Sequence, residues 1–158
     1  MNSLRRILLV DDSPRDRELA INALDDYRLA NELIALRDGA EALDYLFRRG
    51  DFAGRTDAQP AVILLDLKMP RVNGLEALRQ IKADPNLKSI PVVMMTSSRE
   101  EQDMVSSYGL GVNAYVVKPL KFQSFVEAVK QVGSFWAVLN ETVQPLGKET
   151  KAQAELSI

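Results

Sequence analysis

Residues 61–70 read AVILLDLKMP, in which five apolar residues lead directly into a carboxylate. Aliphatic and β-branched side chains follow one another from Ala61 to Leu65 without polar alternation, which predicts a strand buried on both faces of a parallel sheet. Asp66 ends the strand, and Pro70 blocks any extension of it. A charged side chain directly after a buried strand therefore needs an explanation.

Four other short apolar segments alternate with helical patterns along the chain. The expected strands span residues 7–10, 32–36, 91–95 and 114–117, in addition to the strand that ends at Asp66. Five strands separated by helices indicate an α/β fold, because consecutive parallel strands need right-handed crossovers. We therefore expect a doubly wound, five-stranded parallel sheet with helices on both faces.

The expected helices carry start signals and apolar stripes. Ser13 precedes Pro14 at a first helical position, Asp38 can cap a second helix, and Asn73 and Ser98 each stand three residues before a glutamate. The apolar residues that recur at intervals of three and four are Leu19, Ala20, Ala23 and Leu24; Ala40, Leu43, Leu46 and Phe47; Leu75, Leu78 and Ile81; Met104, Val105 and Tyr108; Phe122, Phe125, Val126, Val129, Val132 and Trp136.

Two segments lie outside this alternation. Residues 48–59 form a long polar connection that we expect at the surface, and residues 139–158 form a C-terminal extension too short to be a domain. The 158 residues suffice for one core, so we expect one domain over residues 1–138.

Composition excludes several function classes. With 20 basic and 22 acidic residues the net charge is −2, so no broad positive field favours nucleic acid or anionic lipid. The chain has no cysteine and no histidine, which excludes thiol and Ser-His-Asp catalysis and leaves metal binding to oxygen ligands. No apolar run approaches the roughly 20 residues of a membrane span, and no signal peptide is visible, so we expect a cytoplasmic protein.

Polar residues collect where the expected strands end. Asp11 and Asp12 follow the first strand, Asp66 ends the third, and Thr96 and Lys118 follow the fourth and fifth. Parallel strands bind ligands at this edge of the sheet. Each residue alone has an ordinary explanation as a cap, a turn or a surface residue, but their joint placement on four strand ends indicates a site.

Three carboxylates in one cleft repel one another unless a cation neutralises them, and Mg²⁺ is the natural choice for carboxylate and carbonyl ligands. With its charge shielded, Asp66 could attack phosphorus and form an acyl phosphate. Lys118 would hold a phosphoryl oxygen, and Thr96 would donate its hydroxyl to another.

The segments ILLVDD, LLDLKMPRVNG, VVMMTSS and AYVVKPL resemble the signature blocks of the response-regulator receiver family, over residues 7 to about 138. The resemblance implies a flavodoxin-like domain of strand order 2-1-3-4-5, in which Asp66 accepts a phosphoryl group from a histidine kinase. It also implies that Asp11 or Asp12, with Asp66 and the backbone carbonyl of Lys68, binds Mg²⁺. Asp12 is the favoured direct ligand, with Asp11 acting through water.

The same resemblance implies a switch. Thr96 and Tyr115 match the family's switch pair, in which the hydroxyl moves toward the phosphoryl group and the aromatic ring turns inward. The Lys118–Pro119 bond would be cis, and Lys118 would contact the phosphoryl group. A further similarity, in SYGLGVNAYVVKP and FVEAVKQVGSFW, is to single-domain regulators of phytochrome-type histidine kinases. Lys68 departs from the asparagine common in that subgroup, which affects the expected dephosphorylation rate.

Three functions are compared. The leading one is a phosphorylation switch without an output module, which acts through protein contacts. The second is a hydrolase of small phosphoesters that forms an aspartyl phosphate, but such enzymes usually carry a carboxylate where this chain has Lys68. The third is a dimerisation module without chemistry, which would not need Asp66, Thr96 and Lys118 together.

Apolar residues in the extension include Val143 and Leu146. One explanation is that Trp136 and Leu139 only cover the edge of the core and that the rest is disordered. The other, which we adopt as our prediction, is a homodimer built through a C-terminal arm.

Overall fold

A computed structural model of the chain describes residues 6–25 and 32–131. The described chain forms one parallel sheet in the order β2-β1-β3-β4-β5, which confirms the predicted doubly wound, flavodoxin-like topology. The strands are β1 (Ile7–Val10), β2 (Leu33–Leu36), β3 (Val62–Asp66), β4 (Val92–Thr96) and β5 (Ala114–Val117).

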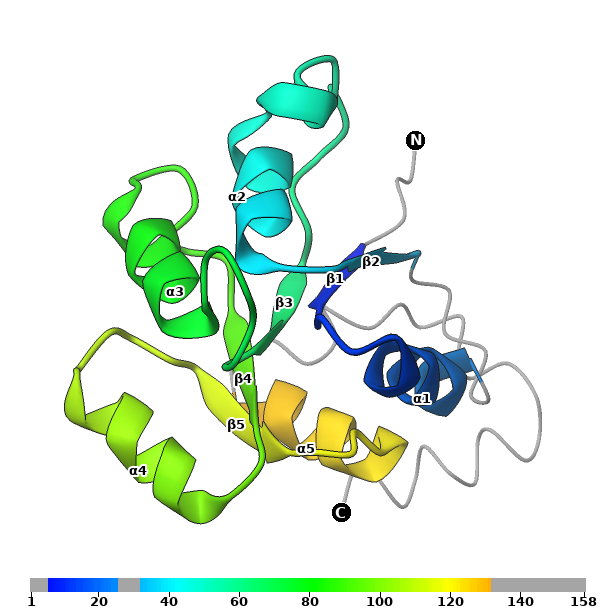
Figure 1. Ribbon diagram of the computed structural model, residues 1–158, viewed down its shortest axis with the longest axis vertical. Helices are drawn as coiled ribbons and strands as arrows, with labels where there is room; N and C mark the ends of the chain where they lie inside the picture. Colours follow the sequence, from blue (N-terminus) through cyan, green and yellow to red (C-terminus); the bar gives the residue numbers. More distant parts are fainter. Residues whose placement is uncertain (1–5, 26–31, 132–158) are drawn as a thin grey trace.

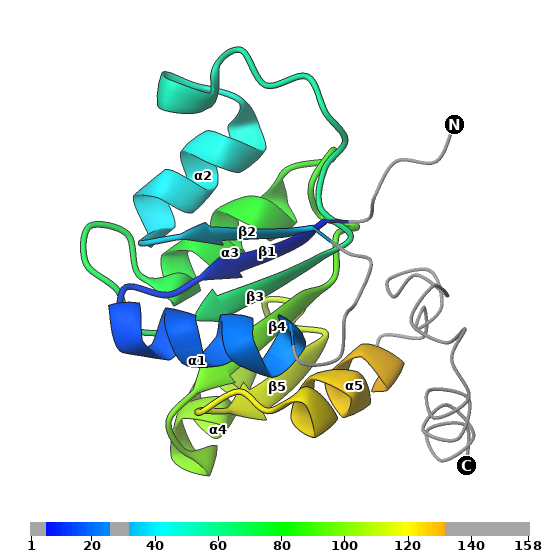
Figure 2. The same ribbon diagram turned by 90° about the vertical axis from the view of Figure 1, so that its right-hand side faces the viewer.

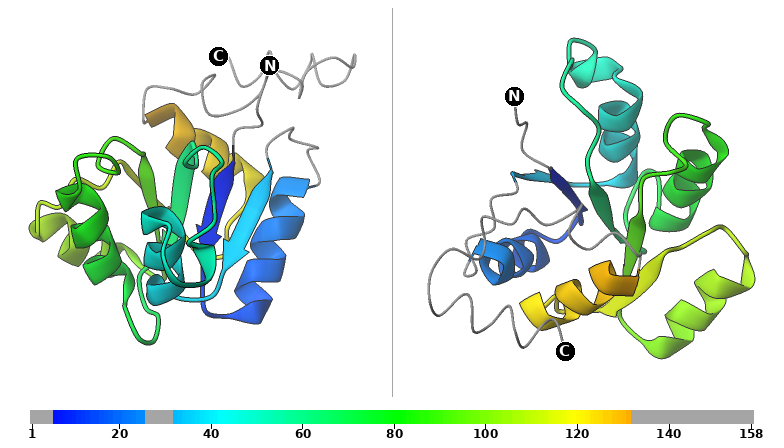
Figure 3. Two further views of the ribbon diagram at one scale, coloured as in Figure 1. Left: turned by 90° about the horizontal axis from the view of Figure 1, so that it is seen from above. Right: turned by 180° about the vertical axis from the view of Figure 1, so that it is seen from behind.

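Helices cover both faces of the sheet. Figure 1 shows α2, α3 and α4 on one face and α1 and α5 on the other. Figure 3 shows the same arrangement from above and from behind. The helices are α1 (Pro14–Asp25), α2 (Gly39–Phe47), α3 (Gly74–Ala83), α4 (Arg99–Ser107) and α5 (Phe122–Gln131).

Side chains of the strands alternate between two apolar layers. In β1, Leu8 and Val10 pack with α2 and α3, whereas Ile7 and Leu9 pack with α1 and α5. The central strand β3 is buried at every position, including Asp66. A strand enclosed in this way has no solvent-facing side, which explains its uninterrupted apolar sequence.

The predicted helix starts are correct. The side chains of Asp38, Asn73 and Ser98 each accept a hydrogen bond from the backbone N–H three residues later. Asp38 also accepts two hydrogen bonds from the Arg71 guanidinium, at 3.0 Å each. One carboxylate thus caps α2 and fastens the loop that follows β3.

Some expected core positions differ from those observed. In α2, Ala42 and Tyr45 are fully buried along with Leu43 and Leu46, whereas Ala40 is only partly buried. In α4 only Val105 is buried. Met104 is 42% exposed and Tyr108 is 58% exposed. The helical period is correct there, but α4 contacts the sheet along a narrower stripe than the sequence indicates. Val132 and Trp136 lie outside the described residues.

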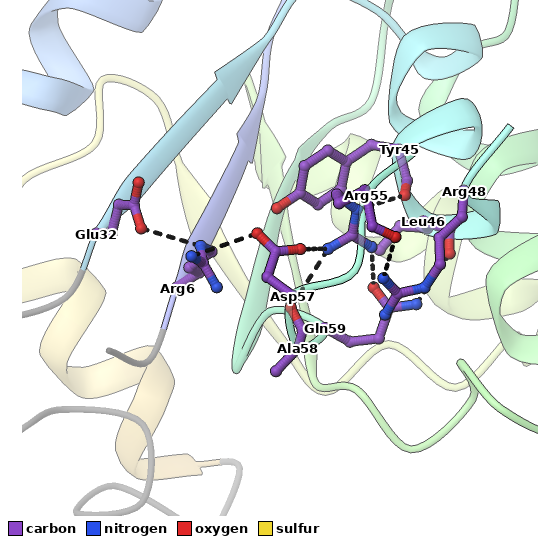
Figure 4. A network of polar contacts seen from close by, with 9 residues as sticks. All are labelled: Arg6, Glu32, Tyr45, Leu46, Arg48, Arg55, Asp57, Ala58 and Gln59. Carbon is purple, nitrogen blue, oxygen red and sulfur yellow. Dashed lines mark hydrogen bonds and ion pairs between the residues drawn. The ribbon is translucent and has the colours of Figure 1, made fainter. Parts of the chain in front are cut away.

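The connection from α2 to β3 lies at the surface as expected, with no fully buried residue between positions 48 and 59, but it is ordered by specific contacts. It contains a short 3-10 helix, Gly50–Phe52, and the Arg55 side chain is only 7% exposed. The Arg55 guanidinium lies 3.9 Å from the centre of the Tyr45 ring and donates hydrogen bonds to the Tyr45 carbonyl and to Asp57 (Figure 4). The hydrogen bonds of a buried guanidinium therefore order a segment whose composition is polar.

Close backbone packing fixes the loop after β3. A side chain at Gly74 would collide with the Asp66 carbonyl oxygen, and the Gly74 N–H donates to the Leu67 carbonyl at 2.8 Å. A side chain at Gly39 would collide with the Val72 carbonyl of the same loop. These contacts hold the end of β3 firmly beneath the loop that follows it.

Candidate functional site

The polar strand ends meet at one edge of the sheet. β1, β3, β4 and β5 are successive neighbours and all run parallel, so Asp11, Asp66, Thr96 and Lys118 follow or end adjacent strands. In Figure 2 the arrowheads of β1 and β3 point to the side on which α1 begins. This is the edge at which open α/β sheets bind ligands.

The acidic residues form a compact cluster. One carboxylate oxygen from each of Asp11, Asp12 and Asp66 lies within 4.8 Å of the others. Asp11 is 1% exposed and Asp66 5% exposed, whereas Asp12 faces solvent. Burial and the neighbouring Asp11 charge raise the pKa of Asp66 to about 7, against the opposing effect of Lys118. The charge and the donor atoms of this cluster fit a hard divalent cation.

Lys118 places its ammonium inside the cluster. Nζ lies 3.1 Å from Asp11 Oδ2, 3.3 Å from Asp66 Oδ1 and 2.8 Å from Asp16 Oδ2. Burial lowers the pKa of Lys118, but the hydrogen bond from Nζ to Asp16 and the charge of Asp66 outweigh it and raise that pKa. Lys118 is therefore a permanent cation beside the Asp66 carboxylate.

The structure adds two residues that sequence reasoning missed. Asp16, in the first turn of α1, pairs with Lys118, and Arg17 donates from Nη1 to the Asp11 carbonyl at 2.8 Å. Their only sequence signal is their place in the helix that follows the acidic pair. The Asp16 contact could not be predicted without the packing of α1 beside the end of β5, and the Arg17 contact depends on how the chain turns from β1 into α1.

Thr96 ends β4 with a hydroxyl that is buried and unpaired. The side chain is 1% exposed, and Oγ1 has no hydrogen-bond partner among the described residues. An unsatisfied buried hydroxyl costs about 1–3 kcal/mol. Such a cost is expected where a polar group is kept for a ligand, and a phosphoryl oxygen is an acceptor of the required kind.

Tyr115 lies on the same face of the sheet as Thr96. Tyr115 lies beside Met94 in the sheet, and Val117 lies beside Thr96. Because residues two apart in a strand point to the same face, the side chains of Tyr115 and Thr96 both project toward the layer of α3 and α4. The Tyr115 ring is partly buried, which raises the pKa of its phenol against a hydrogen bond with Ser106 of α4. The two residues of the predicted switch pair thus share one layer with α4.

Lys68 is beside the site, but its side chain is directed elsewhere. It is 80% exposed, and its ammonium lies 3.0 Å from Glu101 Oε2 in α4. The Lys118–Pro119 peptide bond is cis. The centre of the candidate site is formed by Asp11, Asp12, Asp66 and Lys118, and Thr96 ends the neighbouring strand.

Comparison with known proteins identifies the class. The response regulator receiver domain family matches residues 7–130. The chain belongs to this family, whose members are signalling switches rather than enzymes with an external substrate, and it is a response regulator of the two-component type. No described helix is both long and apolar enough to cross a membrane.

Three relatives narrow the class. The chain is 57% identical to the bacteriophytochrome response regulator AtBRR, covering 89% of this chain and 100% of that one, with a TM-score of 0.83. It is 40% identical over 135 residues to the response regulator Rcp1 of Synechocystis sp., covering 85% of this chain and 90% of Rcp1. A Mn²⁺-bound structure of Rcp1 covers 84% of this chain and 94% of that one at a TM-score of 0.66.

The third relative is the cyanobacterial phytochrome response regulator RcpA in its phosphorylated form. RcpA is 37% identical to this chain, and the match covers 88% of this chain and 100% of RcpA, with a TM-score of 0.69. The similarity to phytochrome response regulators that the sequence indicates is thereby confirmed.

Proposed function

We propose that Asp66 accepts a phosphoryl group from a phosphohistidine of a sensor kinase. An Asp66 carboxylate oxygen forms a bond to phosphorus while the phosphorus–nitrogen bond breaks. The electron pair stays on the imidazole nitrogen, which takes up a proton, and Asp66 becomes an acyl phosphate. The observation that carries the proposal is the position of this buried carboxylate, which is clustered with the Asp11 and Asp12 carboxylates and lies 3.3 Å from the Lys118 ammonium.

We assign Mg²⁺ to the acidic cluster, held by Asp11, Asp12, Asp66 and the backbone carbonyl of Lys68. When bound, the cation neutralises the crowded carboxylates and the incoming phosphoryl oxygens. The raised pKa of Asp66 supports the assignment, because it shows how poorly the protein alone accommodates that negative charge. The Mn²⁺-bound form of Rcp1 supports a divalent ion in this family.

Lys118 and Thr96 would stabilise the phosphorylated state. The Lys118 ammonium lies 3.3 Å from Asp66 Oδ1 and is placed to hold a phosphoryl oxygen, and the Thr96 hydroxyl has a hydrogen bond to donate. Phosphorylation adds a charge of about −1.5 to −2, which would draw the hydroxyl toward Asp66. Tyr115 and α4 share the layer of Thr96, so they are the elements that would respond.

The partner proposals are supported by the relatives. AtBRR and RcpA are response regulators of phytochromes, and the similarity of this chain to them supports a partner kinase of the phytochrome type. We also propose a cytoplasmic protein without nucleic-acid or membrane partners, with a receiver domain over residues 1–138. The predicted homodimer rests on residues 139–158, which lie outside the described residues. Light scattering on the full chain and on the chain without residues 139–158 tests this arm. If both have the same oligomeric state, the extension does not build the dimer.

The site does not favour the hydrolase alternative. Position 68 would have to supply an acid or base, but it holds a lysine whose side chain is 80% exposed and paired with Glu101. A module without chemistry is equally disfavoured, because it would have no use for a buried, unpaired Thr96 hydroxyl beside a cationic Lys118.

Mass spectrometry of the intact protein tests the proposed function. The wild type, Asp66→Asn and the control Asp51→Asn are incubated with Mg²⁺ and a small phosphodonor. Asp51 is exposed in the 3-10 helix after α2 and leaves the site unchanged. We expect one phosphoryl group on the wild type and on the control, and none on Asp66→Asn. Stoichiometric phosphorylation of Asp66→Asn would refute the assignment.

A further inference from the structure

Lys118 is shared among three carboxylates, and the shortest of its ion pairs is to a residue outside the acidic cluster. Asp16 Oδ2 lies 2.8 Å from Nζ, compared with 3.1 Å for Asp11 and 3.3 Å for Asp66. The Asp16 side chain is 32% exposed and that of Lys118 19% exposed. Water therefore screens this pair only in part, and the contact influences where the ammonium rests.

The Asp16 carboxylate is not needed to cap α1. The Asp16 N–H donates to the Ser13 hydroxyl at 3.1 Å, as expected for a helix start. In a complete capping box, the carboxylate would accept the N–H of Ser13 in return. That N–H instead donates to Asp11 Oδ1 at 3.0 Å. The Asp16 carboxylate is thus released from its usual local role and turned toward Lys118.

We propose that Asp16 is a positioning residue that draws the Lys118 ammonium toward itself and thereby weakens the ion pairs of that ammonium with Asp11 and Asp66. This inference rests on the proposed function of the site. Lys118 and a divalent cation compete for the same Asp11 and Asp66 oxygens, so an ammonium drawn toward Asp16 leaves those oxygens more available to the cation. After phosphoryl transfer, Asp16 competes with the phosphoryl group for the same ammonium.

Removing the Asp16 charge from the full chain tests the proposal. In Asp16→Asn, Lys118 moves fully onto Asp11 and Asp66, and the Mg²⁺ affinity measured by titration calorimetry falls about fivefold, as expected for a partly exposed ion pair. Asp16→Glu, which keeps the charge, restores most of the affinity. The control Glu18→Gln removes a charge from an exposed position of the same helix, and its affinity stays within about twofold of wild type.

A double-mutant cycle separates positioning from simple loss of charge. In the Lys118→Met background there is no ammonium to position, so adding Asp16→Asn changes the Mg²⁺ affinity by no more than Glu18→Gln does. If Asp16→Asn weakens Mg²⁺ binding equally with and without Lys118, Asp16 acts only through its charge and the proposal is wrong.

Phosphorylation kinetics give a second readout. The rate for Asp16→Asn falls about fivefold at low Mg²⁺ and recovers at saturating Mg²⁺, because the change affects cation binding rather than the transfer step. A deficit that persists at saturating Mg²⁺ would contradict positioning.

The two proposals fail separately. If wild type binds Mg²⁺ but Asp66 takes up no phosphoryl group, the proposed function fails and the calorimetric cycle still decides the role of Asp16. If wild type is phosphorylated and Asp16→Asn behaves like Glu18→Gln, only the role of Asp16 is refuted.

Discussion

Lys68 and Glu101 form an ion pair of 3.0 Å that joins the loop after β3 to the first turn of α4. Glu101 also accepts the Ser97 N–H at 2.8 Å, and this bond, together with Lys68, lowers the pKa of Glu101. Ser97 directly follows Thr96. The segment beyond Asp66 and the segment beyond Thr96 are therefore held by one carboxylate.

We expect Lys68→Asn to shorten the lifetime of the phosphorylated protein several-fold. The shorter side chain loses the ion pair with Glu101 that fastens the loop after β3 to α4, so the loop beside the proposed Asp66 phosphoryl group would open to water more readily. Decay of the phosphorylated mass after donor removal measures the lifetime, with Lys88→Asn as a control at an exposed position away from the site. An unchanged lifetime would show that the residue at position 68 does not protect the phosphoryl group.

Thr96→Val should have opposite effects on stability and on phosphorylation. In the unphosphorylated protein, the change removes a buried, unpaired hydroxyl at nearly constant volume, so the free energy of unfolding should rise by about 1 kcal/mol. The phosphorylated state would lose a hydroxyl donor that stabilises it, so its lifetime, measured by decay of the phosphorylated mass, should shorten. Urea denaturation measures the first effect. A destabilised Thr96→Val would mean that the hydroxyl is already satisfied.

The raised pKa of Asp66 predicts a pH-dependent stability in the absence of metal. The protonated carboxyl is favoured in the folded state, so Asp66 stabilises the protein below its unfolded pKa of about 4, and this contribution is lost as pH rises to about 7. Relative to Asp66→Asn, the wild type should lose on the order of 2 kcal/mol between these limits. Denaturant titrations in a chelator measure the difference, and parallel pH profiles for the two proteins would contradict the shift.

Arg55 and Arg49 offer a matched pair of arginines near α2. Arg55 is 7% exposed and hydrogen-bonded to the Tyr45 carbonyl and to Asp57, whereas Arg49 is 55% exposed. Arg55→Ala should cost about 3 kcal/mol, because it removes a buried guanidinium together with its hydrogen bonds and its contact with the Tyr45 ring, and Arg49→Ala less than about 1 kcal/mol. Equal losses in thermal or urea unfolding would show that the connection is not held by its buried arginine.

Much of this architecture could be predicted from the sequence, because each prediction depended on local chemistry. The buried run before Asp66 and the caps at Asp38, Asn73 and Ser98 report on residues a few positions apart, and the structure matches them. Placing the polar strand ends together needed one general rule in addition, namely that parallel strands share a carboxyl edge.

The features that were missed depend on contacts between distant segments. Asp16 looks like an ordinary first-turn acid until α1 and the end of β5 lie together, and Arg55 looks like a loop arginine until Tyr45 lies beneath it. The exposure of Met104 and Tyr108 depends on how α4 is seated on the sheet, which the helical period does not determine.

The central claim is that the crowded carboxylates hold a divalent cation and thereby make Asp66 the phosphoacceptor. Its most direct test is a crystal of the full chain soaked in Mn²⁺, with anomalous scattering to locate the ion. We expect one strong peak among the carboxylate oxygens of Asp11, Asp12 and Asp66, beside the Lys68 carbonyl. Mn²⁺ peaks at other positions, with no peak among these three carboxylates, would contradict the claim.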